Sequence, residues 1–292
     1  MNGFSTDWLR QREPFDTTAR DRDLVRRFAV ALKPLQAGTF RIIDLAAGSG
    51  ANFRLLAPLL SGDQAWLLVD HDSRLLEAQS AETMRWALRE GWRCEKFDAG
   101  VTVHSGPATW RAQARPLDLA QALSQLDFTA CDAVTTTAFL DLVSADWIET
   151  FCDQLVRAQR LLFATLTVDG RRAWQPGHAA DALIEDAFAR HQNGDKGFGC
   201  ALGSAATGYV AQRLAGAGYT VSTARSDWQI GQAHREMLRR MAEESVAVAL
   251  ETDPSAAALY GDWLAQRVAL LDAGQLTLTI GHLDLLALPP AR

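Results

Sequence analysis

Apolar residues recur along this chain at two spacings. Runs of aliphatic and β-branched residues predict strands at 41–45, 67–70, 132–137, 161–168, 219–224 and 275–280. The segments between them mostly carry apolar residues at helical spacing. Strands that alternate with helices are typical of a parallel sheet with helices on both faces. The pattern therefore predicts an α/β fold built on a doubly wound sheet.

Three stretches add to this alternation. Residues 1–36 predict an N-terminal helical cap, and Pro14 is expected to divide it because proline is unfavourable inside a helix. Residues 169–203 are punctuated by glycines and predict a lid-like insertion. Residues 229–272 predict a helical insertion. We expect a single domain over residues 1–292 that carries all three additions.

A glycine turn follows the first strand. The segment Asp44-Leu45-Ala46-Ala47-Gly48-Ser49-Gly50 ends an apolar strand and leads into a helical pattern. Glycine permits a sharp bend and a close approach of a ligand to the backbone. Asp70 ends the second strand about twenty residues later, where a carboxylate can hold ribose hydroxyls. Together these features predict a nucleoside site.

The turn departs from the dinucleotide-binding pattern G-x-G-x-x-G. Its third glycine allows close packing of helix and strand, whereas Phe53 stands at that position here. Asp44 would repel a phosphate, but it suits a ligand that carries an ammonium and a sulfonium. A nicotinamide-dependent oxidoreductase is therefore the less favoured interpretation.

At these residues the chain resembles the class I S-adenosylmethionine-dependent methyltransferases, whose first motif D/E-x-x-x-G-x-G matches residues 44–50. The resemblance implies a Rossmann-like methyltransferase fold with a seven-stranded, mostly parallel sheet and an antiparallel last strand. It also implies S-adenosyl-L-methionine as cofactor and S-adenosyl-L-homocysteine as product. Asp118 would accept from the adenine amino group, although a helix cap is the alternative role. The implied cofactor site comprises Asp44, Ala46, Gly48, Gly50, Asn52, Asp70, His71, Asp118, Leu119 and Thr137.

Composition narrows the class of protein. A formal charge of −6 argues against nucleic acid as a partner, and the arginines at 20–27 and 235–240 are interpreted as solvated helix faces. The four cysteines are widely spaced, so neither a metal site nor a disulfide framework is predicted. No signal peptide and no long apolar run is found, so we expect a cytoplasmic protein without a membrane partner, as a monomer or homodimer.

The lid-like insertion supplies most candidates for the acceptor site. Arginine forks bind carboxylates bidentately, so the insertion favours an acidic acceptor, with a solvated loop as the alternative. The candidate substrate residues are Arg171, Arg172, Lys196 and Trp174. A general base is needed only when the acceptor carries a proton, and the candidates are His178, His191 and Asp141.

The segment after the fourth strand limits the acceptor. Members of the resembled family that methylate amino groups often carry N/D-P-P-Y there, whereas this chain has Thr137-Ala138-Phe139-Leu140. We therefore predict a methyltransferase that acts on a small molecule. The alternative from another class is a non-catalytic nucleoside-binding module that engages a partner protein through its insertions.

Overall fold

The computed structural model describes residues 5–32 and 38–291. The ends of the predicted N-terminal cap, residues 1–4 and 33–36, lie outside this range. The helices are α1 (Thr6–Ala19), α2 (Arg22–Leu32), α3 (Ala51–Leu56), α4 (Ser73–Arg89), α5 (Leu119–Ala122), α6 (Ala145–Ala158), α7 (Asp181–Gln192), α8 (Ala206–Gly216), α9 (Arg235–Thr252) and α10 (Ala257–Asp272). The strands are β1 (Phe40–Leu45), β2 (Gln64–Asp70), β3 (Arg93–Phe97), β4 (Gly100–Ser105), β5 (Ala108–Pro116), β6 (Ala133–Thr137), β7 (Leu161–Gln175), β8 (Thr220–Arg225), β9 (Trp228–Ile230) and β10 (Thr277–Leu288).

One sheet runs through the molecule in the order β3-β4-β5-β2-β1-β6-β7-β10-β8, with β9 paired to β10. Its core is β5-β2-β1-β6-β7-β10-β8, in which β5, β2, β1, β6 and β7 pair in parallel. The last strand, β10, inserts antiparallel between β7 and β8. The predicted doubly wound, seven-stranded core with an antiparallel last strand is confirmed.

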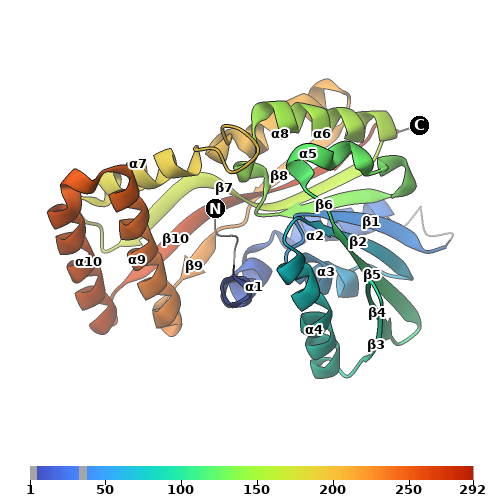
Figure 1. The fold of residues 1–292 in the computed structure, drawn as a ribbon, viewed down its shortest axis with the longest axis horizontal. Helices are drawn as coiled ribbons and strands as arrows, with labels where there is room; N and C mark the ends of the chain where they lie inside the picture. Colours follow the sequence, from blue (N-terminus) through green and yellow to red (C-terminus); the bar gives the residue numbers. More distant parts are fainter. Residues whose placement is uncertain (1–4, 33–37, 292) are drawn as a thin grey trace.

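Helices cover both faces of this core (Figure 1). On one face α2, α3 and α4 pack around Phe28, Phe53 and Trp66, which are 2% exposed or less. On the other face α6 and α8 pack around Phe151 and Leu214, which are fully buried. Strands buried on both faces read as continuous apolar runs, which explains why β1, β2, β6 and the first half of β7 were recognisable.

Two expectations about local structure are wrong. Pro14 lies inside α1, and the chain instead leaves the helix at Arg20, whose backbone is extended. The predicted lid begins as a strand, because β7 continues to Gln175 by pairing with the start of β10. The irregular parts of that insertion are residues 176–180 and the residues after α7.

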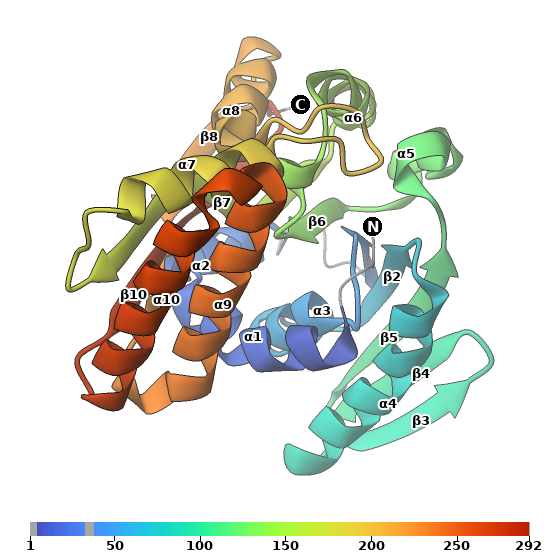
Figure 2. The same cartoon turned by 60° about the vertical axis from the view of Figure 1, so that its left-hand side comes forward.

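The extended ends of β7 and β10 carry a second core, which we call the helical lobe. It consists of the outer halves of these strands with β9, α7, α9 and α10, and lies to the left in Figure 1 and in front in Figure 2. Its interior contains Trp174, Ile184, Leu238, Tyr260 and Trp263, all at most 3% exposed. Within the described residues, no helix has the length and apolarity needed to cross a membrane.

Candidate functional site

The glycine turn lies at the carboxyl end of β1, held by the neighbouring strands. The buried carboxylate of Asp44 accepts from Asn52 Nδ2 at 2.6 Å and from Thr135 Oγ1 at 2.8 Å. Its second oxygen, Oδ2, is buried without a hydrogen-bond partner among the described residues. Burial raises the pKa of Asp44 to about 6. A buried acceptor left open in this way marks a place for a donor from a ligand.

Asp70 connects the turn to the end of β2. One of its oxygens accepts from the backbone nitrogen of Gly48 at 2.8 Å, and the other from that of Asp72 at 2.9 Å. Both bonds fix the carboxylate, and each oxygen keeps a further lone pair for a ligand. His71, the next residue, is exposed, with Nδ1 3.4 Å from Asp70 Oδ1.

The residues predicted for the adenine ring lie after β5, next to Asp70. Leu117 donates its backbone nitrogen to Asp70 O at 2.9 Å, and Asp118 is exposed and caps α5 through Ala120 N at 2.9 Å. Leu119 is 4% exposed, and its carbonyl accepts from Trp147 Nε1 at 2.7 Å. The capping role that the sequence left open for Asp118 is therefore present in the structure.

A loop from the predicted lid also reaches this side. Asp195 Oδ1 accepts from the backbone nitrogens of Gly197 at 2.7 Å and Gly199 at 3.0 Å, which defines a tight turn. The turn presents Phe198 edge-on to Phe139 and Trp147, with ring centroids 5.4 and 5.8 Å away. The segment 195–199 thus anchors the loop between α7 and α8 beside the residues predicted for the adenine ring.

Arg20 is a site residue that sequence reasoning missed. It is 5% exposed and donates to Asn52 Oδ1 at 2.5 Å and to Thr137 Oγ1 at 2.9 Å, so the interpretation of a solvated helix face is wrong here. The guanidinium therefore joins two of the predicted cofactor residues, Asn52 in α3 and Thr137 at the end of β6. In the sequence, Arg20 stands among other charged residues in the way an ordinary surface arginine does, so no local pattern indicated that its side chain is buried.

Three residues other than glycine have left-handed backbone around this point. They are Ala46 after β1, Ala138 after β6 and Leu166 within β7, with φ of 52°, 49° and 56°. This conformation costs about 1–2 kcal/mol for an L-residue, and such strain collects at functional sites when the surrounding structure imposes it. All three surround the carboxyl ends of adjacent strands, where ligands bind in open α/β sheets.

Helix α1 lies over the glycine turn. A Cβ atom added to Gly48 would lie 3.2 Å from Leu9 Cδ1, and Glu13 pairs with the buried Arg54 at 2.7 Å. At its other side α1 contacts the helical lobe, where Asp16 accepts from Trp228 Nε1 at 3.1 Å. The N-terminal helix is thus a cover that rests on both parts of the molecule.

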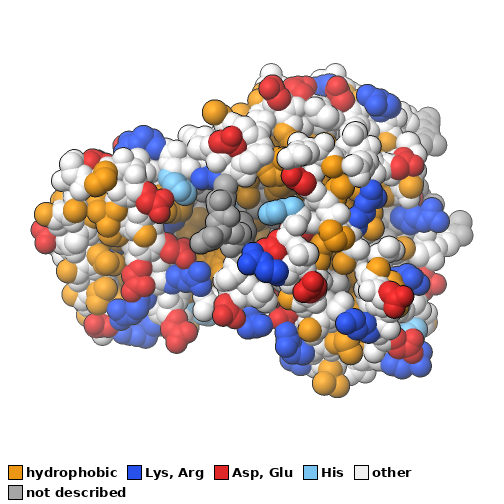
Figure 3. Space-filling model, viewed as in Figure 1, with side chains coloured by type: hydrophobic (Ala, Val, Ile, Leu, Met, Phe, Trp, Pro, Cys, Tyr) orange, Lys and Arg blue, Asp and Glu red, His pale blue; other side chains and the backbone are white. Residues whose placement is uncertain are grey.

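A cavity of about 520 Å³ lies between α1, the strand ends and the helical lobe. In Figure 3 the surface is hollowed there, with hydrophobic side chains in the hollow. The cavity is lined by Ser5, Trp8, Arg12, Ala138, Asp141, Leu142, Val168, Gly170, Arg171, Arg172, Glu185, Phe188, Ala189, Gln192, Trp228, Arg240, Met241, Glu244, Ile280 and His282. Ala138, which lines the cavity, directly follows the predicted cofactor residue Thr137 in the chain.

Some predicted acceptor residues line this cavity and others do not. Asp141, Arg171 and Arg172 line it, as does Trp228. Trp174 is instead packed against Trp263 in the lobe, with ring centroids 5.4 Å apart. Three further candidates are not among the lining residues and make local contacts elsewhere: His178, His191 and Lys196.

Besides the pair Arg172 Nε and Glu185 Oε1, two side chains of the cavity wall have a buried polar atom without a hydrogen-bond partner among the described residues. Asp141 is 5% exposed with Oδ1 unpartnered, and burial raises its pKa to about 6. His282 is 3% exposed with Nδ1 unpartnered, and burial lowers its pKa to about 4, so the imidazole is neutral near neutral pH. His282 lies in β10 and also lines the cavity.

Replacement of Asp141 by asparagine is expected to stabilise the protein in a pH-dependent way. A carboxyl group whose pKa is higher in the folded than in the unfolded chain favours folding at acid pH and disfavours it once the pH exceeds both values. The advantage of the variant in free energy of unfolding should therefore grow by roughly 2 kcal/mol between about pH 4.5 and about pH 7.5. Urea unfolding at both pH values measures it, and an equal difference at both would contradict the buried, unpaired carboxyl group.

A scan against protein-family models finds no match. A search of curated proteins finds none either. Among solved structures, this chain is similar to a cyclopropane synthase from Mycobacterium tuberculosis, with 12% identity and a TM-score of 0.47 over 97% of this chain and 94% of that one. It is also similar to a SAM-dependent methyltransferase from Thiobacillus denitrificans solved with S-adenosyl-L-homocysteine, with 14% identity and a TM-score of 0.42 over 99% of each chain.

A third similar structure is a longer protein, a phosphoethanolamine N-methyltransferase from Haemonchus contortus in complex with phosphomonomethylethanolamine and S-adenosylhomocysteine. The identity is 12% and the TM-score 0.42, over 99% of this chain and 59% of that one. This chain therefore spans 59% of the length of that enzyme. At these identities the likeness concerns the fold.

Proposed function

We propose that this protein is an S-adenosylmethionine-dependent methyltransferase that acts on a small-molecule acceptor. The observation that carries the proposal is the meeting of Asp44, the turn Gly48–Gly50 and Asp70 at the carboxyl ends of parallel strands. Asp70 contacts the turn directly through Gly48 N at 2.8 Å. A separate cavity of about 520 Å³ is lined by Ala138, the neighbour of the predicted cofactor residue Thr137, and this volume lies in the range of small-molecule sites.

The residues present fit this cofactor. Asp44 offers a buried, unpartnered carboxylate oxygen for an ammonium group. Asp70 has lone pairs for two ribose hydroxyls, since its backbone bonds use one on each oxygen. Gly48 and Gly50 have φ of 53° and 80°, a conformation that favours glycine, so the turn keeps the backbone bare beside the ligand.

S-adenosylmethionine, when bound, supplies a methyl group on a sulfonium, which leaves as the neutral thioether of S-adenosylhomocysteine. The donor is therefore already activated, and the protein's main task is to orient the acceptor, which can contribute about 7–11 kcal/mol to lowering the barrier. The walls of the cavity hold the acceptor, and α1 covers the glycine turn against water.

Asp141 is the candidate proton acceptor of this site. It lines the cavity directly after β6, and a pKa of about 6 leaves it ionised near neutral pH but more basic than an exposed aspartate. An acceptor that loses an N–H or O–H proton during methylation would transfer that proton to its carboxylate. His178 and His191, the other sequence candidates, would first have to reach the cavity.

Calorimetric titration with S-adenosylmethionine, S-adenosylhomocysteine and NAD tests the cofactor half of the proposal. We expect the two sulfur nucleosides to bind and NAD not to bind. Asp44 disfavours a pyrophosphate, and Phe53, which is fully buried, occupies the position of the third glycine. Binding of NAD alone, or of none of the three compounds, would refute the proposal.

A further inference from the structure

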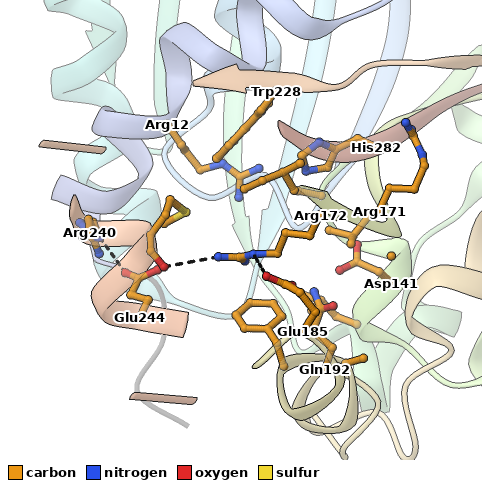
Figure 4. A pocket seen from close by; sticks show the side chains of 18 of the residues that line it. Arg12, Asp141, Arg171, Arg172, Glu185, Gln192, Trp228, Arg240, Glu244 and His282 are labelled. Atoms are coloured by element: carbon orange, nitrogen blue, oxygen red, sulfur yellow. Dashed lines mark hydrogen bonds and ion pairs between the residues drawn. The ribbon is translucent and has the colours of Figure 1, made fainter. Parts of the chain in front are cut away.

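Three arginines of the cavity wall are each stacked on an aromatic ring of the same wall. The guanidinium carbon of Arg172 lies 4.4 Å from the ring centroid of Phe188, and that of Arg240 lies 4.3 Å from the ring of Trp8. Arg12 lies 5.1 Å from the ring of Trp228. They come from β7, α9 and α1, and Figure 4 shows the three side chains around the cavity.

Each guanidinium is held on one side by other side chains. Arg12 donates to both oxygens of Asp16, at 2.9 and 3.2 Å. Arg240 donates Nε to Glu244 at 2.7 Å and Nη1 to Gln11 Oε1 at 2.8 Å. In each case the bonds fix the plane of the fork.

Arg172 is the most deeply placed of the three. Its Nη2 donates to Ser245 Oγ at 2.6 Å, and its Nε lies 3.3 Å from Glu185 Oε1. The side chain is 9% exposed, and burial raises the pKa of Glu185, which weakens that carboxylate as a counter-ion. A buried guanidinium whose counter-ion is this weakly paired is stabilised when a further anion binds to it.

One terminal nitrogen of each of the three guanidinium groups remains available to donate to a ligand. Within residues 5–32 and 38–291, no hydrogen-bond partner is found for Nη1 of Arg12, Nη1 of Arg172 or Nη2 of Arg240. An aromatic ring below the guanidinium blocks its face, so the edge is the part that a ligand reaches. Arginine edges presented in a fixed plane match the oxygens of carboxylates and phosphates.

We propose that the methyl acceptor is a small organic anion whose carboxylate or phosphate group is bound by Arg12, Arg172 and Arg240. The inference rests on the proposed function, because it takes this cavity as the acceptor site. Figure 4 shows Arg240 and Asp141 on opposite sides of the cavity, with the guanidinium groups of Arg12 and Arg172 drawn between them. An anionic group bound on the side of Arg240 leaves the rest of the acceptor to extend toward the carboxylate that receives the proton.

Four probes of similar shape separate the charge of the ligand from its size. Phenylacetate and phenyl phosphate are anionic, phenylacetamide is neutral and phenethylamine is cationic. We expect calorimetry on the protein, with and without saturating S-adenosylhomocysteine, to show at least about tenfold tighter binding of an anionic probe than of the amide, a difference of about 1.4 kcal/mol. Comparison of the two anions shows whether the site prefers a carboxylate or a phosphate.

Neighbouring arginines of α9 provide a matched pair of variants. Arg240→Gln should weaken binding of the anionic probe about tenfold or more, since a hydrogen bond to a charged group contributes about 1.5–3 kcal/mol. Arg239→Gln should leave it unchanged, because Arg239 pairs with Asp272 on α10 at 3.6 Å and does not line the cavity. The double variant Arg240→Gln/Glu244→Gln removes the acid as well, and should bind the anion as weakly as the single variant.

Three outcomes would overturn the proposal. One is tighter binding of the amine than of either anion, and another is binding of none of the probes. The third is recovery of anion binding in the double variant. The weaker binding of the single variant Arg240→Gln would then result from repulsion by Glu244, which has lost its partner, and not from a lost contact with Arg240. Anion binding without any binding of S-adenosylhomocysteine would refute the proposed function alone, whereas cofactor binding without anion preference would refute this inference alone.

Discussion

Replacement of Asp70 by asparagine is expected to weaken binding of S-adenosylhomocysteine about 100-fold. The two backbone bonds from Gly48 and Asp72 hold the carboxylate at the end of β2, where it can accept from two ribose hydroxyls. Each hydrogen bond to a charged group contributes about 1.5–3 kcal/mol, and an amide keeps only one acceptor oxygen. A loss of about 2.7 kcal/mol corresponds to this factor, and calorimetric titration measures it.

Asp72→Asn is the matched control for this experiment. Asp72 lies two residues further on and caps α4 by accepting from Arg74 N at 2.9 Å. Asparagine is as good an N-cap as aspartate, so both the fold and the affinity for the nucleoside should be kept. If Asp70→Asn binds S-adenosylhomocysteine as tightly as Asp72→Asn, the ribose contact does not exist.

Arg267→Met is expected to lower the free energy of unfolding by about 3–5 kcal/mol, because it breaks a buried ion pair and leaves one partner uncompensated. Arg267 is 1% exposed, pairs with Asp181 and donates to Pro176 O at 2.5 Å. Asp181 also accepts from Trp263 Nε1 at 2.7 Å, so the cluster joins α7 to α10. Urea unfolding gives the loss, and hydrogen exchange should locate it in the helical lobe.

An exposed arginine serves as the comparison. Arg213 pairs with Glu149 and Asp153 at the surface between α6 and α8, with 32% of its side chain exposed. Such pairs typically contribute about 0–1 kcal/mol, so Arg213→Met should have a small effect. Equal losses in the two variants would mean that the buried cluster does not hold the lobe together.

The arrangement of the residues proposed to bind the cofactor was predictable because its signals are local in the sequence. Asp44, Gly48 and Gly50 fall within one turn, and Asp70 ends the next strand, so strand periodicity alone brings them to one edge of the sheet. The acceptor half comes from three segments far apart in the chain. Arg12 with Asp16, and Arg240 with Glu244, have the i,i+4 spacing of a solvated helix pair, and only the tertiary fold turns these pairs toward a cavity.

The helices α9 and α10 of the lobe lie within the predicted helical insertion 229–272, whereas its strand β7 was predicted poorly for a related reason. Beyond Val168, β7 reads Asp169-Gly170-Arg171-Arg172, a polar sequence that suggests a loop. It remains a strand because β10 pairs with it as far as Thr277 opposite Gln175, a contact across about one hundred residues that no local pattern reveals. The wrong prediction for Trp174 has the same cause. As part of a lid it was expected to contact the substrate, whereas in the strand β7 it points into the core of the lobe.

The pairing of β7 with β10 also decides which parts of the molecule can move. Both strands continue from the central sheet into the helical lobe, so the two cores share one hydrogen-bonded ladder, with register shifts at Ile280/His282 and Leu283/Leu285. Hinge closure needs a few residues that are free to change their backbone angles. A rotation of the lobe relative to the central sheet would break hydrogen bonds between β7 and β10. The covering helix α1 is held at its end as well, because the buried Arg20 that follows it donates to Asn52 Oδ1 and Thr137 Oγ1. The central sheet and the helical lobe are therefore expected to behave as one frame, to which α1 is fastened.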